Sequence, residues 1–248
     1  MTCSTEAPRI PRNHLLAALP PEIYAELRPR LDVVELSLRQ VVLEANQLID
    51  LVYFPESGWL SMLAYLDDGD VSEVALIGQE GMVGLPVVLG GDSDILEAMV
   101  QGSGTALRMS AAALQEAMER FPILTSLLLR HALVHQRQVA RTAVCNGQHS
   151  DNQRLARWLL MAHDRAGGDE FLMSDDFLAM MLGVHRGKAM ACVSALQTAG
   201  LIHYEEDQLR IMHRLSLEHT ACECYSLEQR DQDRILGRWA DAINNNQR

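Results

Sequence analysis

Turn signals divide residues 33–107 into short segments, and this pattern constrains the fold more than any other feature of the chain. The turns fall at residues 46, 55–58, 67–70, 78–81 and 90–92, and the runs between them are rich in Val, Leu, Ile and Tyr. Turn signals about ten residues apart are typical of an antiparallel β-roll, sandwich or barrel. The segment therefore predicts an all-β domain of about eight strands.

Helical spacing appears on both sides of this β segment. Apolar residues in roughly the first thirty positions predict two short helices, the second of which begins at Pro20 and Pro21. After the β segment, the hydroxyl of Ser110 can cap a helix over residues 111–120.

Pro122 can begin a much longer helix, which we expect over residues 123–145. It has no interior Pro or Gly, and its length indicates a connector between domains or a dimer seam. A helix buried within one subunit is the alternative, because polar residues interrupt its central apolar face. These are His131, Gln138 and Arg141.

Asn146 and Gly147 should end the long helix and mark the domain boundary. Beyond them, the spacing predicts helices over residues 151–166, 175–181 and 185–199, a β-hairpin over 201–212 and a terminal helix from Ser216. Three helices followed by a hairpin is the order of a winged helix. We therefore expect an α+β chain in three parts. They are a sensory β-roll or jelly-roll domain with flanking helices (1–121), a dimerisation or connector helix (122–146) and a winged helix-turn-helix domain (147–248).

Residues 174–196 fit a helix-turn-helix. Two helices that cross over a short turn need a small residue where they touch and a residue that tolerates the turn. Ala179 and Gly183 stand in these places, and Ser174 followed by two Asp residues can start the first helix. Apolar side chains fill the inner positions: Leu178, Leu182, Val184, Ala189, Cys192, Val193 and Leu196.

The second helix of this motif would enter the major groove of DNA with its first turn. Arg186 suits bidentate contact with a guanine edge, whereas His185 and Lys188 suit phosphates. The residues that we expect to contact DNA are Ser174, His185, Arg186, Gly187, Lys188, Met190, Ala191 and Ser194.

The net charge of the chain is unfavourable for binding nucleic acid, and the second helix of the motif is the local exception. The chain has 21 basic and 33 acidic residues and a net charge of −12, which repels phosphate unless the cations are gathered on one surface. Residues 185–203 contain no Asp or Glu, and they include Lys188, the only lysine in the chain. The predicted DNA-probing helix is thus the local exception in an acidic protein.

Several motifs are shared with a known family. They are VYFP at 52–55, GQEGMVG at 78–84, RLARWLL at 154–160, FLAMMLGV at 177–184 and LQTAGLI at 196–202. With these motifs and the N-terminal helices, nearly the whole chain resembles a Crp/Fnr-type transcription regulator. The resemblance implies a cyclic-nucleotide-binding-like jelly roll, a dimerisation helix and a winged helix-turn-helix. It also implies a homodimer that reads a palindromic operator in double-stranded DNA, with RNA polymerase as a further candidate partner.

The chain departs from the family in the loop where cyclic-AMP-binding members carry an arginine for the cyclic phosphate. No arginine lies between Arg39 and Arg108, and nearby Asp and Glu side chains at 92, 94 and 97 add negative charge. An anionic nucleotide would meet repulsion there, so we predict no tight binding of cyclic AMP. An effector in the corresponding place would contact Gly81, Gly84, Leu85, Ile95 and Leu96.

The predicted DNA surface departs from the family as well. Gly187 and Ala191 stand where cyclic-AMP-responsive members have Glu and a second Arg, so base recognition must differ. The hairpin turn at residues 205–207 is acidic, although this turn is often basic in the family. With so few cations, we predict modest affinity and a shallow dependence on salt.

Five cysteines at irregular spacing indicate reduced thiols rather than a disulfide framework. Only Cys3 lies near the N-terminus, so we expect no iron–sulfur centre of the kind the oxygen-sensing branch of the family carries. The nearest metal-like group is His219, Cys222 and Cys224, but Cys-x-Cys is tighter than the usual zinc spacing. We expect ordinary thiols and no metal or cofactor, with a redox or metal role as the alternative.

The sequence contains few residue pairs that could catalyse a reaction, and their contexts do not favour catalysis. Asp67 and Asp68 lie in a turn, His131 and His135 lie on the connector helix, and the glycine spacing at 78–84 lacks the strand-to-helix context of a phosphate loop. We therefore expect a regulator rather than an enzyme, and a non-DNA-binding adaptor with the same fold is the alternative. No apolar segment is long enough to span a bilayer and no signal pattern begins the chain, so we expect a cytoplasmic protein without a membrane partner.

Overall fold

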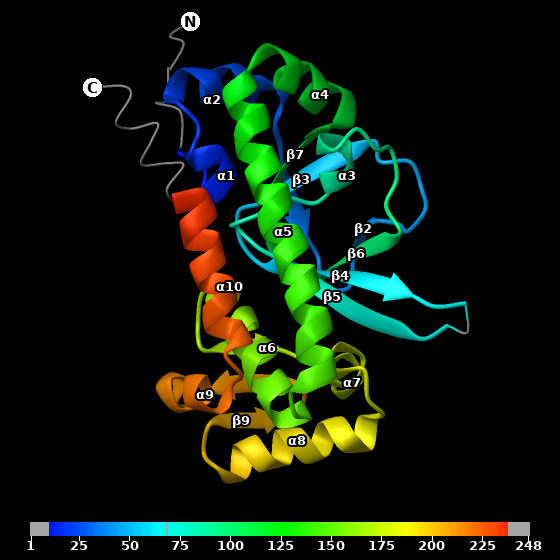
Figure 1. The fold of residues 1–248 in the computed structure, drawn as a ribbon, viewed down its shortest axis with the longest axis vertical. Helices are drawn as coiled ribbons and strands as arrows, with labels where there is room; N and C mark the ends of the chain where they lie inside the picture. The colour runs from blue at the N-terminus through cyan, green and yellow to red at the C-terminus, as the bar shows by residue number, and fades with distance from the viewer. Residues whose placement is uncertain (1–9, 68, 238–248) are drawn as a thin grey trace, which may run out of the picture.

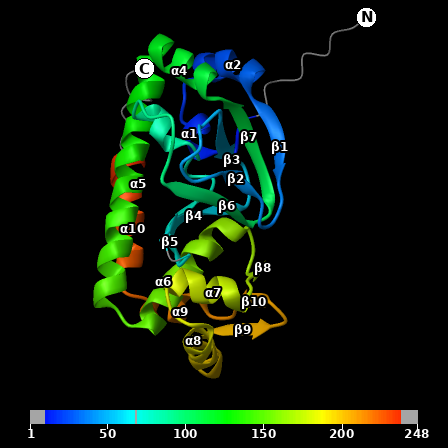
Figure 2. The same cartoon turned by 90° about the vertical axis from the view of Figure 1, so that its right-hand side faces the viewer.

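The computed structural model describes residues 10–67 and 69–237, and it has the α+β architecture that the sequence predicts. A β domain occupies one end of the molecule and a mainly helical domain the other (Figure 1). The long helix α5 (Pro122–Gln148) runs along the side of the β domain and reaches the helical domain (Figures 1 and 2).

Two antiparallel sheets form the β domain, with strand orders β1-β7-β3 and β2-β6-β4-β5. Their strands are β1 (Asp32–Leu36), β2 (Val41–Leu43), β3 (Leu51–Pro55), β4 (Trp59–Tyr65), β5 (Val71–Ile77), β6 (Leu96–Gly102) and β7 (Gly104–Ser110). Buried side chains from both sheets, among them Phe54, Leu60 and Val100, belong to one apolar core. The predicted β-roll or jelly roll is therefore confirmed.

The described residues form seven strands in this domain, one fewer than the sequence predicts. The aliphatic run after Gly84 folds as the short helix α3 (Leu85–Val88) instead of a strand. Pro86 has no N–H to donate to a strand ladder, and Gly84 has a positive φ of 94° that turns the chain out of the sheet.

Short helical elements precede and follow the strands of the β domain in sequence. They are α1 (His14–Ala17), α2 (Pro21–Leu27), the 3-10 turn η1 (Arg28–Arg30) and α4 (Ala111–Arg120). The Oγ of Ser110 accepts a hydrogen bond from the Ala113 amide at 3.1 Å, so the predicted cap of α4 is confirmed.

Helix α5 extends beyond its predicted end at Asn146 and Gly147. Gly147 keeps a helical conformation, and the chain leaves the helix only at His149, whose φ and ψ are extended. A helix of this length tolerates one exposed glycine near its end, since the glycine weakens a helix by only about 1 kcal/mol. In the part of the chain that the structure describes, no helix is long and apolar enough to cross a membrane.

The C-terminal domain contains the predicted three helices and hairpin. Its elements are α6 (Asp151–Ala166), β8 (Glu170–Leu172), α7 (Asp175–Leu182), α8 (Arg186–Thr198), β9 (Ile202–Glu205), β10 (Gln208–Ile211), α9 (Arg214–Thr220), α10 (Cys224–Gln232) and the π-helical turn η2 (Asp233–Gly237). Two features differ from prediction: β8 adds a third strand to the hairpin, and two helices replace the single one expected from Ser216.

The two domains pack against each other through aromatic side chains. Trp59 on β4 belongs to the apolar core of the C-terminal domain, and its ring meets Phe171 of β8 edge-on at 5.6 Å between centroids. Within the C-terminal domain, Trp158 of α6 makes a similar edge-on contact with Phe177 of α7. The domain boundary near residue 147 remains a prediction, because the apolar core crosses from one domain into the other.

Candidate nucleic-acid interface

The helix-turn-helix consists of α7 and α8 joined at Gly183. Gly183 has φ 61° and ψ 39°, the left-handed conformation that favours glycine at a helix C-terminus. Ala179 is buried at the contact between the helices, and the Val184 amide donates to its carbonyl at 3.1 Å. The predicted inner side chains are buried, apart from Val184, which is half-buried.

The outer face of α8 is open to solvent at the end of the molecule opposite the N-terminal helices (Figures 1 and 2). Arg186, Gly187, Lys188, Ala191 and Ser194 are exposed, as the spacing predicts. Met190 is half-buried. Five of the eight predicted contact residues, at positions 186, 187, 190, 191 and 194, therefore share one face of α8, and Lys188 is exposed beside them in the first turn.

His185 and Ser174 serve first as helix caps. The Nδ1 of His185 accepts a hydrogen bond from the Lys188 amide at 3.2 Å, which leaves only Nε2 available to donate to a phosphate. Ser174 accepts from the Phe177 amide at 3.3 Å at the start of α7. Ser174 also lines a groove between α7 and the β domain, away from the exposed face of α8.

Both cations on this face are paired with acidic residues of the same chain. Arg186 lies 2.6 Å from Asp175 and 3.7 Å from Asp176, and Lys188 lies 2.6 Å from Asp151. The side chains of Arg186 and Lys188 remain 63% and 52% exposed. Exposed ion pairs contribute little, typically under ~1 kcal/mol, so a phosphate or base edge can replace the acidic partner.

Asp175 is held in place by a second contact. The hydroxyl of Tyr204 in β9 donates to its carboxylate at 2.5 Å, and this hydrogen bond, with the charge of Arg186, lowers the pKa of Asp175. Asp175 is therefore a fixed anion that orients Arg186. The sequence motif contains both cations and the aspartates that pair with Arg186, but Asp151 and Tyr204 come from elements outside the motif.

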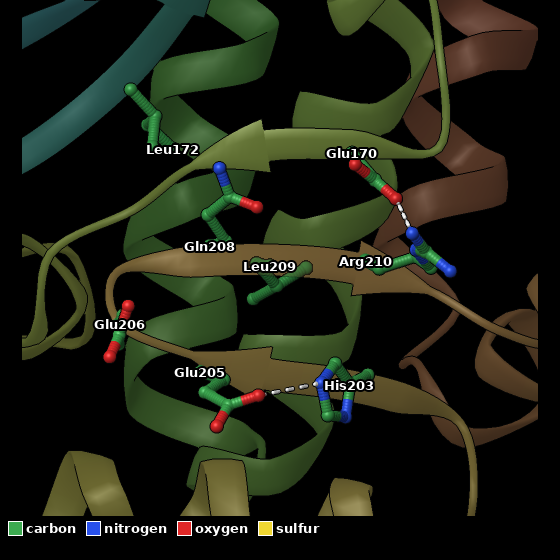
Figure 3. Close-up of a pocket in the computed structure, with 8 residues that line it drawn as sticks. All are labelled: Glu170, Leu172, His203, Glu205, Glu206, Gln208, Leu209 and Arg210. Atoms are coloured by element: carbon green, nitrogen blue, oxygen red, sulfur yellow. Dashed lines mark ion pairs between the residues drawn. The ribbon is translucent and has the colours of Figure 1, made fainter.

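The wing, which is the hairpin of β9 and β10, carries negative charge that would repel a phosphate. Its turn holds Glu205, Glu206 and Asp207, and the last two have positive φ values of 48° and 62°. On the sheet face drawn in Figure 3, Glu205 lies 3.5 Å from His203 and Glu170 pairs with Arg210, so each basic side chain has an acidic neighbour. The acidic wing that the sequence predicts lies beside a surface with no unpaired cation among the residues drawn.

Two glycines of the predicted effector pocket have packing roles. A Cβ on Gly81 would lie 2.9 Å from the ring of His131 on α5, and a Cβ on Gly84 would lie 2.8 Å from Val52. His131 is buried, and burial lowers its pKa to about 4, so the ring is neutral. The glycines thus allow their loop to approach α5 and β3 closely.

The other three residues of that predicted pocket have different surroundings. Leu85 at the start of α3 and Leu96 at the start of β6 are half-buried against the main core, whereas Ile95 is 74% exposed. The effector site therefore remains a prediction.

The exposed face of α5 forms a regular seam. Residues 126, 129, 133, 136, 140, 143 and 147 alternate in steps of three and four, and all are exposed. Leu129 and Leu133 are 47% and 41% exposed, and small residues follow at 140, 143 and 147. This spacing is the heptad of a two-helix coiled coil.

The polar residues that interrupt the apolar pattern of α5 lie off this seam. Gln138 donates to Glu228 of α10 at 2.6 Å, and Arg141 pairs with Asp231 at 2.7 Å. Helix α10 covers that face of α5 (Figure 1). These polar residues thus belong to contacts within one chain, and the polar positions of the seam itself are Ser126 and Gln136.

A buried carboxyl group lies at the contact between the domains. Glu73 of β5 accepts hydrogen bonds from the Ser61 hydroxyl at 2.5 Å and from the indole of Trp158 on α6. Burial raises its pKa to about 7, while these hydrogen bonds and the charges of Arg157 and Arg165 act in the opposite direction. Spacing in the sequence gives no sign of this group, because its partners are distant in the chain.

Two family models match this chain, one in the β domain and one in the C-terminal domain. A family model described as the cyclic nucleotide-binding domain matches residues 33–121, and one described as the Crp-like helix-turn-helix domain matches residues 153–220. The comparison with curated protein sequences gave no match.

Solved structures of low sequence identity share the fold. FixK2 from Bradyrhizobium japonicum is 18% identical, with a TM-score of 0.67 over 77% of this chain and 98% of that one. The c-di-GMP-responsive global regulator CLP from Xanthomonas campestris is 17% identical, with a TM-score of 0.64 over 77% and 99% of the two chains. A CRP-family transcriptional regulator from Thermus thermophilus is 16% identical, with a TM-score of 0.62 over 76% and 96%.

Proposed function

Because the chain belongs to the Crp/Fnr family, which consists of transcriptional regulators rather than enzymes, we propose that it is a sequence-specific regulator that binds its operator as a homodimer. The observation that carries this proposal is the exposed face of α8, which presents two cations, small side chains and a helix N-terminus at the end of the molecule. We infer that the regulator acts in the cytoplasm, where the operator lies.

Arg186 and Lys188 have different roles in the proposed complex. Arg186 lies in the first turn of α8, and its planar guanidinium suits the O6 and N7 atoms of guanine. Lys188 and the Nε2 of His185 suit phosphates, and Gly187 and Ala191 allow the helix to approach the bases closely. Ser174 is assigned a phosphate contact at most, because its hydroxyl already caps α7.

The seam on α5 supports the homodimer. Pairing two copies of α5 along residues 126–147 buries Leu129 and Leu133 of both chains and places two α8 helices on one side of the dimer. A two-fold dimer reads a palindromic site, since each recognition helix meets one half-site. RNA polymerase is the partner that such a dimer would contact at a promoter.

The β domain is proposed to sense something other than cyclic AMP, or to act as a scaffold for the dimer. The acidic loop at residues 92–97 supports this, and so does the relative CLP, which is described as responsive to c-di-GMP. Calorimetric titration with cyclic AMP tests it. We expect no measurable heat at micromolar ligand, and saturable micromolar binding would contradict the proposal.

DNA binding is tested by selecting sequences from a genomic DNA library with the full-length protein, followed by mobility shifts on the enriched operator. Arg186→Ala and Lys188→Ala should each weaken binding about tenfold or more, because every dimer loses two contacts. Arg230→Ala removes an exposed arginine of α10 and is the matched control. Normal operator binding by both α8 variants would refute the site.

The paired cations and the acidic wing favour one alternative, a regulatory adaptor that does not bind DNA. The library selection distinguishes the two functions. An adaptor elutes from genomic DNA at ~0.1 M salt without enriching any sequence, whereas a regulator enriches a palindrome.

A further inference from the structure

Four side chains with metal-binding atoms meet where α5 ends. Cys145 lies in the last turn of α5 and His149 in the link to α6, while Cys222 lies in the turn between α9 and α10 and Cys224 begins α10. One ligand atom from each lies within 4.8 Å of the others. The three cysteines are buried and form a cluster of their own, separate from both apolar cores. Simple core packing therefore does not account for them.

The distances within the group fit a single tetrahedral ion. The Sγ atoms of Cys145 and Cys222 are 3.5 Å apart, and the Sγ of Cys224 is 3.7 Å from the Nδ1 of His149. Zinc–sulfur and zinc–nitrogen bonds of about 2.3 and 2.05 Å at tetrahedral angles require separations of about 3.8 Å and 3.6 Å. These two separations need only small adjustments, and the remaining pairs of ligand atoms lie within 4.8 Å.

A carboxylate orients the histidine ring. Glu223 lies between the two C-terminal cysteines in sequence, and its Oε2 is 3.3 Å from the Nε2 of His149. The carboxylate thus lies on the Nε2 side of the ring, and Nδ1 on the other side faces the Sγ of Cys224. Histidines that bind metals are commonly held by a carboxylate in this way.

A disulfide or an iron–sulfur cluster would explain fewer of these observations than a single metal ion does. A disulfide between Cys145 and Cys222 would not explain why Cys224 and His149 lie beside these two cysteines. An iron–sulfur cluster contains several metal atoms, and ligand atoms this close together suit one ion. His219, the histidine that the sequence pairs with these cysteines, is exposed and outside the group.

We propose that Cys145, His149, Cys222 and Cys224 bind one zinc ion. Three thiolates and one imidazole are a common structural zinc set, with no open position for catalysis. The ion joins the end of the connector helix to the α9–α10 turn and so fixes the link between α5 and the helix-turn-helix domain. This proposal is independent of DNA binding.

Metal analysis of the full-length protein, purified without chelators and reconstituted with zinc under reducing conditions, tests the site. We expect one zinc per chain in the wild type and in two controls, His219→Ala and Cys192→Ser. His149→Ala and Cys222→Ser should retain less than about a tenth of that amount. Cobalt in place of zinc should give the strong thiolate-to-cobalt absorption of a tetrahedral site, which His149→Ala should lose.

A second measurement tests the site in the wild type and in His219→Ala, so it does not depend on variants that fold poorly. Chelator should lower the melting temperature of the wild type and of His219→Ala, and added zinc should restore it. Absence of stoichiometric zinc in the wild type, or unchanged zinc in folded His149→Ala, overturns the proposal. A Cys145–Cys222 disulfide found by mass spectrometry in zinc-free protein also overturns it.

Discussion

Arg186 is neutralised by its own chain before it meets a phosphate or a base. Asp176 is 85% exposed and lies 3.7 Å from the guanidinium, where it would also repel an approaching phosphate backbone. Asp176→Asn should therefore strengthen operator binding about two- to fivefold at low salt and less at high salt, because salt screens exposed charges. Fluorescence anisotropy at two salt concentrations measures this. Glu119→Gln, on α4 at the other end of the molecule, should have no effect.

Glu73 should make stability depend on pH. Its pKa is about 7 in the folded protein and 4.5 when unperturbed, so between these values the folded state holds a proton that the unfolded state releases. Stability from this group is therefore full below about pH 4.5, falls as pH rises to about 7 and is constant above, with a total change of at most ~3 kcal/mol.

Glu73→Gln should remove this dependence and stabilise the protein more at pH 8 than at pH 5. The amide oxygen can still accept from Trp158, and the Ser61 hydroxyl can rotate to accept from the amide. Urea unfolding at both pH values measures the effect, and the difference from wild type cancels the contribution of His131. An equal change in stability at pH 5 and pH 8 would contradict the assignment.

The residue patterns that the sequence predicts well are those set by local spacing. The inner and outer faces of α8 follow from helical periodicity alone. The caps at Ser110 and Ser174 follow from a serine placed directly before the first helical residue. The ion pair of Lys188 with Asp151 and the contact of Glu73 with Trp158 join segments far apart in the chain. Such pairings depend on tertiary packing, which spacing does not encode.

At the scale of elements, α5 is where the dimer can be tested. An aspartate at position 133 would place two like charges opposite each other in the apolar seam of a parallel pair. Leu133→Asp should therefore give a monomer with little operator binding, as measured by sedimentation and mobility shift. Leu215→Asp makes the same change at an exposed position on α9 and should leave the dimer intact. A dimeric Leu133→Asp protein would place the interface elsewhere.

The elements that the sequence misses are short and depend on their neighbours. Strand β8 has only three residues and exists because β10 pairs with it, and α3 forms where Pro86 prevents a strand. The longer α4, α6, α7 and α8 carry their own caps and periodicity, so their bounds are predicted closely. His149 enters the cysteine group only because α5 continues past Gly147 and brings the link to α6 beside the α9–α10 turn.

For the whole molecule, net charge and local charge compete in DNA binding. The chain carries −12 overall, and each subunit offers Lys188 and one histidine nitrogen to phosphates while Arg186 reads a base, so a dimer neutralises about two to four phosphates. The logarithm of the binding constant should then fall with the logarithm of salt with a slope of about −2 to −4. Lys188→Ala should make this slope shallower by about two, one for each subunit, while weakening different operators equally.

Arg186→Ala should instead reduce discrimination between operators. Salt titrations of both variants measure these effects, and an unchanged slope for Lys188→Ala would mean that the lysine stays with Asp151 in the complex.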